Sequence, residues 1–217
     1  MKSYIKRTAV TASCIVGLCA VGYVAATRVN LNPYRSAGEI VDEFNQVKVY
    51  FNGGIYNTSG RNLAADGYNL GIKYQCVEFI KRYYFERFGH EMPEARGNAK
   101  DFFDANTPDG AVNTERNLRQ FRDGSSTPPR PEDILVLGPG VFNSYGHVAI
   151  VSQVTDRYIE IVQQNPGPFA TSRENIPLRH TDNRWIVDNH RVLGWLRMPS
   201  PVGDRKRIGD ESVAGVP

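Results

Sequence analysis

The sequence predicts an α+β fold, in which helices come first along the chain and the strands of an antiparallel sheet follow. Two observations support this prediction: a clear helical pattern over residues 76–88, and several β-rich runs that follow one another after residue 132. Strands in such an order pair in antiparallel fashion rather than in βαβ units. A chain of 217 residues, 41% hydrophobic and 23% charged, is sufficient for one globular domain.

The N-terminal segment, residues 1–27, combines a positive start with a long uncharged run. Lys2, Lys6 and Arg7 precede the stretch 8–26, which holds no charged residue. A positive start followed by about 20 largely apolar residues is typical of a hydrophobic helix that spans a membrane. The length favours a membrane anchor, whereas small residues at its end leave a cleaved signal peptide open. In either case we expect the rest of the chain to be exported, to the periplasm or the cell surface.

The segment before the main helix has weaker patterns. Residues 28–45 are predicted to form a spacer that becomes helical near Ile40. The alternating stretch 47–53 ends in Gly-Gly and predicts a strand, and the polar stretch 57–71 predicts a loop. The folded domain is expected to occupy residues 46–199.

The helical pattern over residues 76–88 has an apolar side and a charged side. The apolar side repeats at helical spacing through Val77, Ile80, Tyr84 and Phe88. The other side carries the charged residues Glu78, Lys81, Arg82 and Glu86. Gly89 follows at the position where a glycine commonly ends a helix.

Downstream of this helix, residues 94–106 predict a second, shorter helix. Four β-rich runs follow, separated by Gly, Pro, Asn and Asp, at residues 133–137, 147–154, 158–164 and 192–198. Residues 200–217 are polar and lack a pattern, so we expect a disordered tail.

Charge and cysteine content exclude several classes of protein. A formal charge of +3 is too small and too scattered to predict a nucleic-acid partner. Cys14 and Cys19 lie in the N-terminal segment, which leaves Cys76 as a single thiol in the folded part. No disulfide framework and no CxxC metal site is available, so we expect no metal and no cofactor. We also expect a monomer.

Cys76 lies where the predicted helix begins. Unpaired backbone N–H groups and the positive end of the helix dipole stabilise a thiolate there and lower its pKa. The N–H of Cys76 would also point toward an oxyanion formed on an attacked carbonyl. The alternative is that Cys76 is a small buried apolar residue without chemical function.

His147 is the candidate proton carrier among four histidines. It follows a glycine and begins a very apolar strand, so a rigid backbone would hold the ring at the end of that strand. A histidine beside an apolar strand can also be a core residue without a catalytic role. His90, His180 and His190 are predicted to be surface or loop residues.

Gln163 is the candidate partner for the second ring nitrogen of the histidine. In the run 158–164, Ile159, Ile161 and Gln163 share one face of the strand, which makes Gln163 the polar end of a buried face. Asn165 and Glu160 are the fallback acceptors. The alternative is that Gln163 only ends the strand.

Several segments of the sequence, in order and at suitable spacing, resemble one known family. They are "LGIKYQCVEFIKRYY", "GNAKDFF", "PRPEDILVL", "GHVAIV", "IEIVQQN" and "VLGWL". Together they resemble the CHAP domain, the cysteine- and histidine-dependent amidohydrolase/peptidase family, and within it the amidase domains of glutathionylspermidine synthetase/amidases. The resemblance spans residues 46–198. It implies a papain-like α+β fold, Cys76 as nucleophile, His147 as general base and acid, and an acyl-enzyme intermediate.

The sequence departs from this family at two positions. The family often has a glutamate where Gln163 stands, and a neutral amide stabilises an imidazolium less well than a carboxylate does. Glu132 precedes Asp133 where the family usually has Gly-Asp, and we expect this to affect only a turn. Gln75, next to the nucleophile, could add a donor to the oxyanion pocket.

These observations predict an exported cysteine hydrolase that cuts amide bonds in peptidoglycan peptides. One alternative is an amidase for glutathione–polyamine conjugates, as the resemblance taken literally implies, although export argues against a cytosolic substrate. A second alternative, motivated by Gln163, is a catalytically silent module that binds wall peptides.

Overall fold

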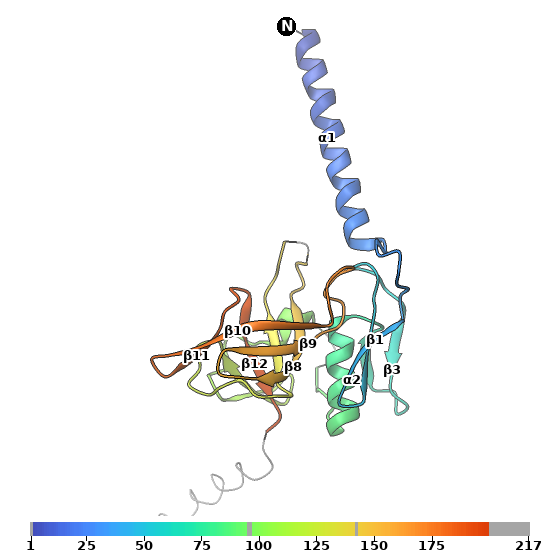
Figure 1. Cartoon of the computed structure of the whole chain (residues 1–217). Coiled ribbons are helices and arrows are strands. Elements are labelled where there is room, and N and C mark those ends of the chain that lie inside the picture. Colours follow the sequence, from blue (N-terminus) through green and yellow to red (C-terminus); the bar gives the residue numbers. More distant parts are fainter. Residues whose placement is uncertain (1, 95–96, 142, 200–217) are drawn as a thin grey trace, which may run out of the picture.

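The computed structural model describes residues 2–94, 97–141 and 143–199, so the tail predicted at 200–217 lies outside the described residues. The described part has an α+β architecture with one long N-terminal helix, one central helix and an antiparallel sheet (Figure 1). The helical elements are α1 (Lys2–Arg28), α2 (Cys76–Phe88) and the 3-10 turn η1 (Ala99–Phe102).

The sheet has eight strands in the order β11-β10-β9-β8-β7-β12-β6-β5, and every neighbouring pair is antiparallel. Its strands are β5 (Val112–Asn113), β6 (Leu118–Arg122), β7 (Ile134–Leu137), β8 (His147–Val154), β9 (Tyr158–Val162), β10 (Arg173–Thr181), β11 (Arg184–Val187) and β12 (Val192–Arg197). The antiparallel sheet predicted from the sequence is therefore confirmed.

The sheet has an apolar core on each face because its central strands are buried on both sides. One core, which includes Val136, Val148 and Ile150, packs against α2. The other includes Leu135, Ala149 and Trp195. This explains why β7 and β8 are continuous apolar runs rather than alternating ones.

Strands β10 and β11 were not predicted from the sequence. β10 includes Arg173, Pro177 and Thr181, and most of its residues are at least partly exposed. Only two of its side chains, Ile176 and Leu178, are buried in the second core. Because so few side chains of β10 are buried, its sequence shows only a weak alternation of apolar and polar residues.

Two small hairpins replace the spacer and the loop predicted before α2. They are β1 (Ile40–Phe44) with β2 (Val47–Tyr50), and β3 (Arg61–Leu63) with β4 (Asn69–Ile72). The predicted helix near Ile40 is thus wrong. Asn45 and Gln46 both have positive φ, 49° and 69°, as a two-residue hairpin turn requires.

Most of the charged side of α2 is buried, because β2 and β4 pack against the helix that the sheet already contacts, and only Glu86 of that side is exposed. Glu78 is 1% exposed, and Lys81 and Arg82 are also buried. Glu78 and Arg82 form an ion pair of 2.6 Å. Gly89 ends the helix in the left-handed conformation predicted for it.

The second predicted helix, residues 94–106, is wrong in extent. Within the described residues of this segment, only the four-residue turn η1 is helical. Asn98 and Asp101 form a capping box at its start, and Phe102 is buried in the core beneath it. Burial of Phe102 therefore anchors a single helical turn.

Helix α1 projects away from the body, and only its C-terminal end contacts it (Figure 1). No helix among the described residues is both long and apolar enough to cross a membrane, contrary to the anchor that the sequence predicted at residues 8–26. Thr27, at the helix end, is buried, and its carbonyl accepts the backbone N–H of Tyr56 at 2.8 Å. Gly54 lies so close that a Cβ there would be 2.8 Å from the Arg28 carbonyl carbon.

Candidate active site

Cys76 is the first residue of α2, as predicted. Gln75 precedes it with an extended backbone, and its side chain does not cap the first N–H groups of the helix. The backbone N–H groups of Val148, Val77 and Cys76 itself point at the thiol sulfur. The sulfur therefore lies against the first turn of the helix and the start of β8.

The protonation state of Cys76 differs from the sequence-based expectation. Burial raises the pKa of Cys76 to about 11, and the three backbone N–H groups offset only part of this effect. The helix N-terminus does favour the thiolate, but the loss of hydration is the larger contribution. Cys76 is therefore a thiol at neutral pH.

His147 is the first residue of β8 and is buried. Gly146 before it has a φ of 78°, and a Cβ at that position would be 2.6 Å from the Leu137 carbonyl oxygen, so only glycine fits. Burial lowers the pKa of His147 to about 4. The hydrogen bond that the ring donates to Gln163 raises this pKa in part, and the charge of Arg191 lowers it further. The resting imidazole is neutral.

Gln163 follows β9 directly, and its Oε1 lies 2.9 Å from Nε2 of His147. This is the contact that the alternation of side chains along the strand predicted. The Gln163 Nε2 donates to the Thr171 carbonyl and to the Glu174 carboxylate, both at 3.3 Å. Because the amide nitrogen has two acceptors, its oxygen must face the histidine, and the ring carries its proton on Nε2. The Nδ1 atom of His147 is then free to accept a proton.

The structure brings the three predicted residues to one place. His147 and Gln163 are in direct contact. Cys76 lies at the same strand end, because its sulfur receives the N–H of Val148, the residue after His147. Their catalytic roles remain predictions.

Gln75 does not have the role predicted for it. Its Nε2 donates to the carbonyls of Ile55 and Asn57, at 3.3 and 2.6 Å, so both amide hydrogens are used. Its Oε1 accepts from Asn165 at 2.8 Å. Gln75 therefore holds the chain around Ile55 in place and has no hydrogen left for an oxyanion.

The fallback partners of His147 are engaged elsewhere. Asn165 donates to Gln75 and to the Ile55 carbonyl. Glu160 binds Ser152 at 2.7 Å and Arg173 at 2.9 Å. Gln163 is thus the acceptor that the structure places at the ring.

A buried polar network behind Cys76 was missed in the sequence. Gln164 donates to the Gln75 carbonyl at 3.0 Å and to Glu78 at 2.8 Å, and it accepts the N–H of Tyr50 at 2.8 Å. The ion pair of Glu78 with Arg82 completes this network. Side chains alternate between the two faces of a strand, so Gln164 points to the face opposite Gln163, toward α2. This alternation could have indicated Gln164 as a member of the network.

A cleft of about 790 Å³ opens beside Cys76. Its walls come from the end of α1, the 55–61 segment, the β4–α2 turn and residues 143–146. The lining side chains include Tyr23, Tyr56 and Tyr145. The rings of Tyr56 and Tyr145 pack edge to face, with 5.6 Å between their centroids. Among the described residues that line it, the charged ones are Arg28 and Arg61, both positive. The cleft therefore presents a positive potential near the thiol.

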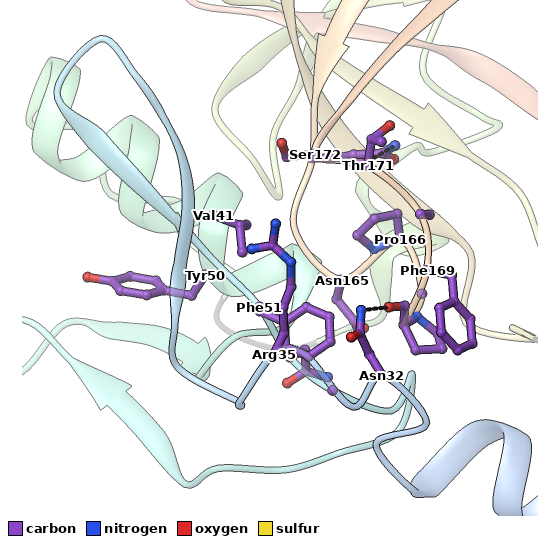
Figure 2. Close-up of a pocket in the computed structure, with 16 residues that line it drawn as sticks. Asn32, Arg35, Val41, Tyr50, Phe51, Asn165, Pro166, Phe169, Thr171 and Ser172 are labelled. Carbon is purple, nitrogen blue, oxygen red and sulfur yellow. Dashed lines mark hydrogen bonds between the residues drawn. The ribbon is translucent and has the colours of Figure 1, made fainter.

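A second cavity, of about 230 Å³, lies on the other side of Gln163. Figure 2 shows Arg35, Val41 and Phe51 facing the loop 165–172 across it. Asn32 donates to the Pro168 carbonyl at 2.8 Å and ties the segment after α1 to this loop. The loop that carries Thr171 toward the Gln163 amide is thus tied to the segment that follows α1.

The other three histidines lie apart from this site. His90, predicted at the surface, is buried, and its Nε2 lies 2.9 Å from the Arg116 carbonyl. His180 stacks on Trp185 with 4.3 Å between the ring centroids. Neither they nor His190 line the cleft beside Cys76.

Glu132 stands where the family usually has glycine, and its backbone conformation is unfavourable for a residue with a side chain. Its φ is 73°, a conformation that favours glycine. Its carboxylate accepts from Arg87 at 2.9 Å and from Asn45 at 2.9 Å. The neighbouring Asp133 is buried and pairs with Arg197 at 2.7 Å. The side-chain contacts of Glu132 offset the unfavourable backbone of the turn.

Comparison with known proteins finds a family and several relatives. Residues 66–165 match the family model of the CHAP domain. Trypanothione synthetase of Crithidia fasciculata is 30% identical over 151 residues, which cover 65% of this chain and 23% of that protein. Bifunctional glutathionylspermidine synthetase/amidase of Escherichia coli (strain K12) is 33% identical over 98 residues, which cover 44% of this chain and 16% of that protein.

The chain spans less than a quarter of the length of these relatives. Among solved structures, that of a wild-type endolysin aligns with a TM-score of 0.38 at 24% identity, covering 68% of this chain and 62% of that chain. That TM-score is too low to show a common fold.

Proposed function

The chain contains a CHAP domain, and we propose that it is a cysteine amidohydrolase/peptidase that hydrolyses amide bonds in peptidoglycan peptides. The observation that carries the proposal is the His147–Gln163 hydrogen bond, which leaves the Nδ1 atom of His147 free to act as a base at the strand end where the Cys76 sulfur lies. We take the arrangement to be papain-like, with the nucleophile on a helix and the base on an antiparallel sheet.

The first half-reaction transfers the acyl group to sulfur. As a carbonyl carbon approaches Cys76, Nδ1 of His147 takes the thiol proton and the sulfur forms a bond to that carbon. The carbonyl electron pair moves to oxygen, and the backbone N–H of Cys76 stabilises the resulting oxyanion. The imidazolium then gives its proton to the amide nitrogen, the C–N bond breaks, and a thioester remains.

The second half-reaction regenerates the thiol. His147 takes a proton from water, whose oxygen attacks the thioester carbon. The C–S bond breaks, the sulfur recovers the proton from the imidazolium, and a carboxylic acid leaves. Gln163 supports both steps because its oxygen accepts the Nε2 proton in the neutral and the protonated ring.

The charge of the cleft supports a peptide substrate that carries carboxylates. Arg28 and Arg61 line it, and no acidic residue does so among the described residues. Peptidoglycan stem peptides carry free carboxylates, which the arginines can bind. The alternative substrate, a glutathione–polyamine conjugate, has a cationic amine portion that these arginines would repel.

Export is part of the same proposal. Lys2, Lys6 and Arg7 before the uncharged stretch 8–26 are typical of a secretion signal. Recovery of the chain from the periplasm or the medium supports this, and recovery from the cytosol alone contradicts it.

Release of soluble peptides from purified peptidoglycan tests the activity. The full chain should release new amino and carboxyl termini, whereas Cys76→Ala should lower the rate by at least about a thousandfold, since covalent catalysis is lost. Cys14→Ser/Cys19→Ser is the matched control, because both thiols are exposed on α1, and it should retain full activity.

Equal release by the chain and by Cys76→Ala would contradict the proposal. Binding without release would identify the silent module that the neutral Gln163 had suggested. Cleavage of a glutathione–polyamine conjugate but not of wall fragments would replace the substrate and keep the chemistry.

A further inference from the structure

We infer that Glu174 is a positioning residue of the active site, which acts on His147 through Gln163 and supplies the negative charge that the neutral glutamine lacks. The inference rests on the proposed function. It adds a fourth group, and the order of contacts becomes Cys76, His147, Gln163 and Glu174.

Strand register places Glu174 on the correct face. Glu174 of β10 is paired with Ile161 of β9, and Ile161 and Gln163 share one face because they are two residues apart. The backbone N–H of Gln163 donates to the Ser172 carbonyl at 2.8 Å, so the pairing continues past the end of β9. Glu174 is then the diagonal neighbour of Gln163 across two paired strands.

The contact itself has a defined direction. The Gln163 Nε2 donates to Glu174 Oε2 at 3.3 Å, and the Gln163 Oε1 accepts from His147 at 2.9 Å. A carboxylate that accepts from an amide N–H draws positive charge toward that side and makes the amide oxygen a stronger acceptor. The imidazolium that forms during acyl transfer is the state that benefits.

The side chain of Glu174 makes few other contacts. Its side chain is exposed, and Gln163 is its only hydrogen-bond partner among the described residues. The neighbouring carboxylate Glu160 is different, since it binds Arg173 and Ser152. Arg191 is the charged side chain whose positive charge lowers the His147 pKa. A carboxylate at Glu174 opposes that positive charge.

Charge-neutral replacement of Glu174 is the direct test. Glu174→Gln keeps an oxygen that can accept from Gln163 and removes only the charge. We expect kcat to fall about tenfold with KM unchanged, and the His147 pKa, followed by NMR of the ring, to fall further. Glu160→Gln, which neutralises a carboxylate of the same strand pair, is the matched control and should leave the His147 pKa unchanged.

Exchange of the two side chains provides the second test. Gln163→Glu alone places two carboxylates within hydrogen-bond distance, where one of them must take up a proton, so we expect no gain in kcat. Gln163→Glu/Glu174→Gln places the single negative charge directly at His147. We expect this double variant to have at least the kcat of the wild type and a raised His147 pKa.

Two results would overturn the inference. One is Glu174→Gln with the kcat and His147 pKa of the wild type, which would make the contact merely structural. The other is the same kcat for Gln163→Glu with and without Glu174→Gln. The NMR measurement needs no substrate, so it remains informative if the wild type releases nothing from peptidoglycan, an outcome that contradicts the proposed function alone.

Discussion

At the scale of single residues, burial makes Cys76 and His147 neutral in the resting protein. The pKa of Cys76 is raised to about 11 and that of His147 is lowered to about 4, so neither group is charged near pH 7. In the mechanism that we propose, the Cys76 thiolate therefore forms only when its proton moves to His147 as substrate binds. This arrangement resembles a hydroxyl nucleophile with its base more than a preformed thiolate–imidazolium pair.

The low pKa of His147 should extend the activity to acidic pH. The base is His147 in its neutral form, which persists down to a pH of about 4, so kcat/KM should stay nearly constant from pH 8 to pH 5 and fall only below that. A histidine with the ordinary pKa of about 6.5 would lose most of its activity by pH 5. Peptide release measured from pH 3 to pH 9 checks this, with His180→Gln as control for the other histidines. An acidic limit near pH 6.5 would contradict it.

Much of the site could be predicted at this scale. The helix start at Cys76, the strand start at His147 and the alternation to Gln163 are local patterns, and the hydrogen bond between the last two agrees with them. The Cys76 pKa could not be predicted, because it depends on burial by distant segments. The engagement of Gln75 by Ile55 was equally hidden, since 20 residues separate them.

At the scale of elements, α2 depends on charged side chains that it buries. Glu78 and Arg82 are packed under the β3–β4 and β1–β2 hairpins, and Asn62 of β3 donates to Glu78 at 2.8 Å. The spacing of residues along the helix predicted a charged side, but it did not indicate that two hairpins would bury that side. The strands of these hairpins are three to five residues long, and in the sequence only the alternating stretch 47–53 indicated one of them.

Removal of one partner of this ion pair should destabilise the domain. Arg82→Met leaves the Glu78 carboxylate buried and unpaired, so we expect the free energy of unfolding to fall by about 3–5 kcal/mol. Glu78→Leu/Arg82→Met removes both charges and should be less destabilised than Arg82→Met. Chemical denaturation of both variants measures this. A double variant that is the less stable of the two would contradict the expectation.

At the scale of the whole molecule, α1 is both a projecting rod and part of the cleft wall. Tyr23 and Arg28 from its last turns line the cleft, and a hydrogen bond with Tyr56 raises the pKa of Tyr23. A cleavage after Ala26, which small residues at 24–26 would permit, leaves Thr27 and its contact with Tyr56 but removes Tyr23. The sequence predicted a membrane anchor or a signal peptide in this segment and did not indicate its place in the cleft.

Substitution of Gly54 tests this role of α1. Gly54→Ala places a Cβ 2.8 Å from the Arg28 carbonyl carbon and should push the helix end away from the body. We expect KM for a soluble stem peptide to rise about three- to tenfold and α1 to become more sensitive to limited proteolysis, with kcat unchanged. Gly22→Ala, at a site with open space around it, is the control. Unchanged KM and proteolysis for Gly54→Ala would contradict a role of α1 in the cleft.

The raised pKa of Cys76 has a consequence beyond catalysis. Peroxide oxidises the thiolate form of a cysteine to sulfenic acid, and at neutral pH only about one in ten thousand molecules would hold this thiolate if its pKa is near 11. An enzyme that works outside the reducing cytosol would thereby keep its nucleophile intact between turnovers. A sulfur that stays protonated would therefore be oxidised slowly, so the domain would keep its reactive thiol in oxidising surroundings.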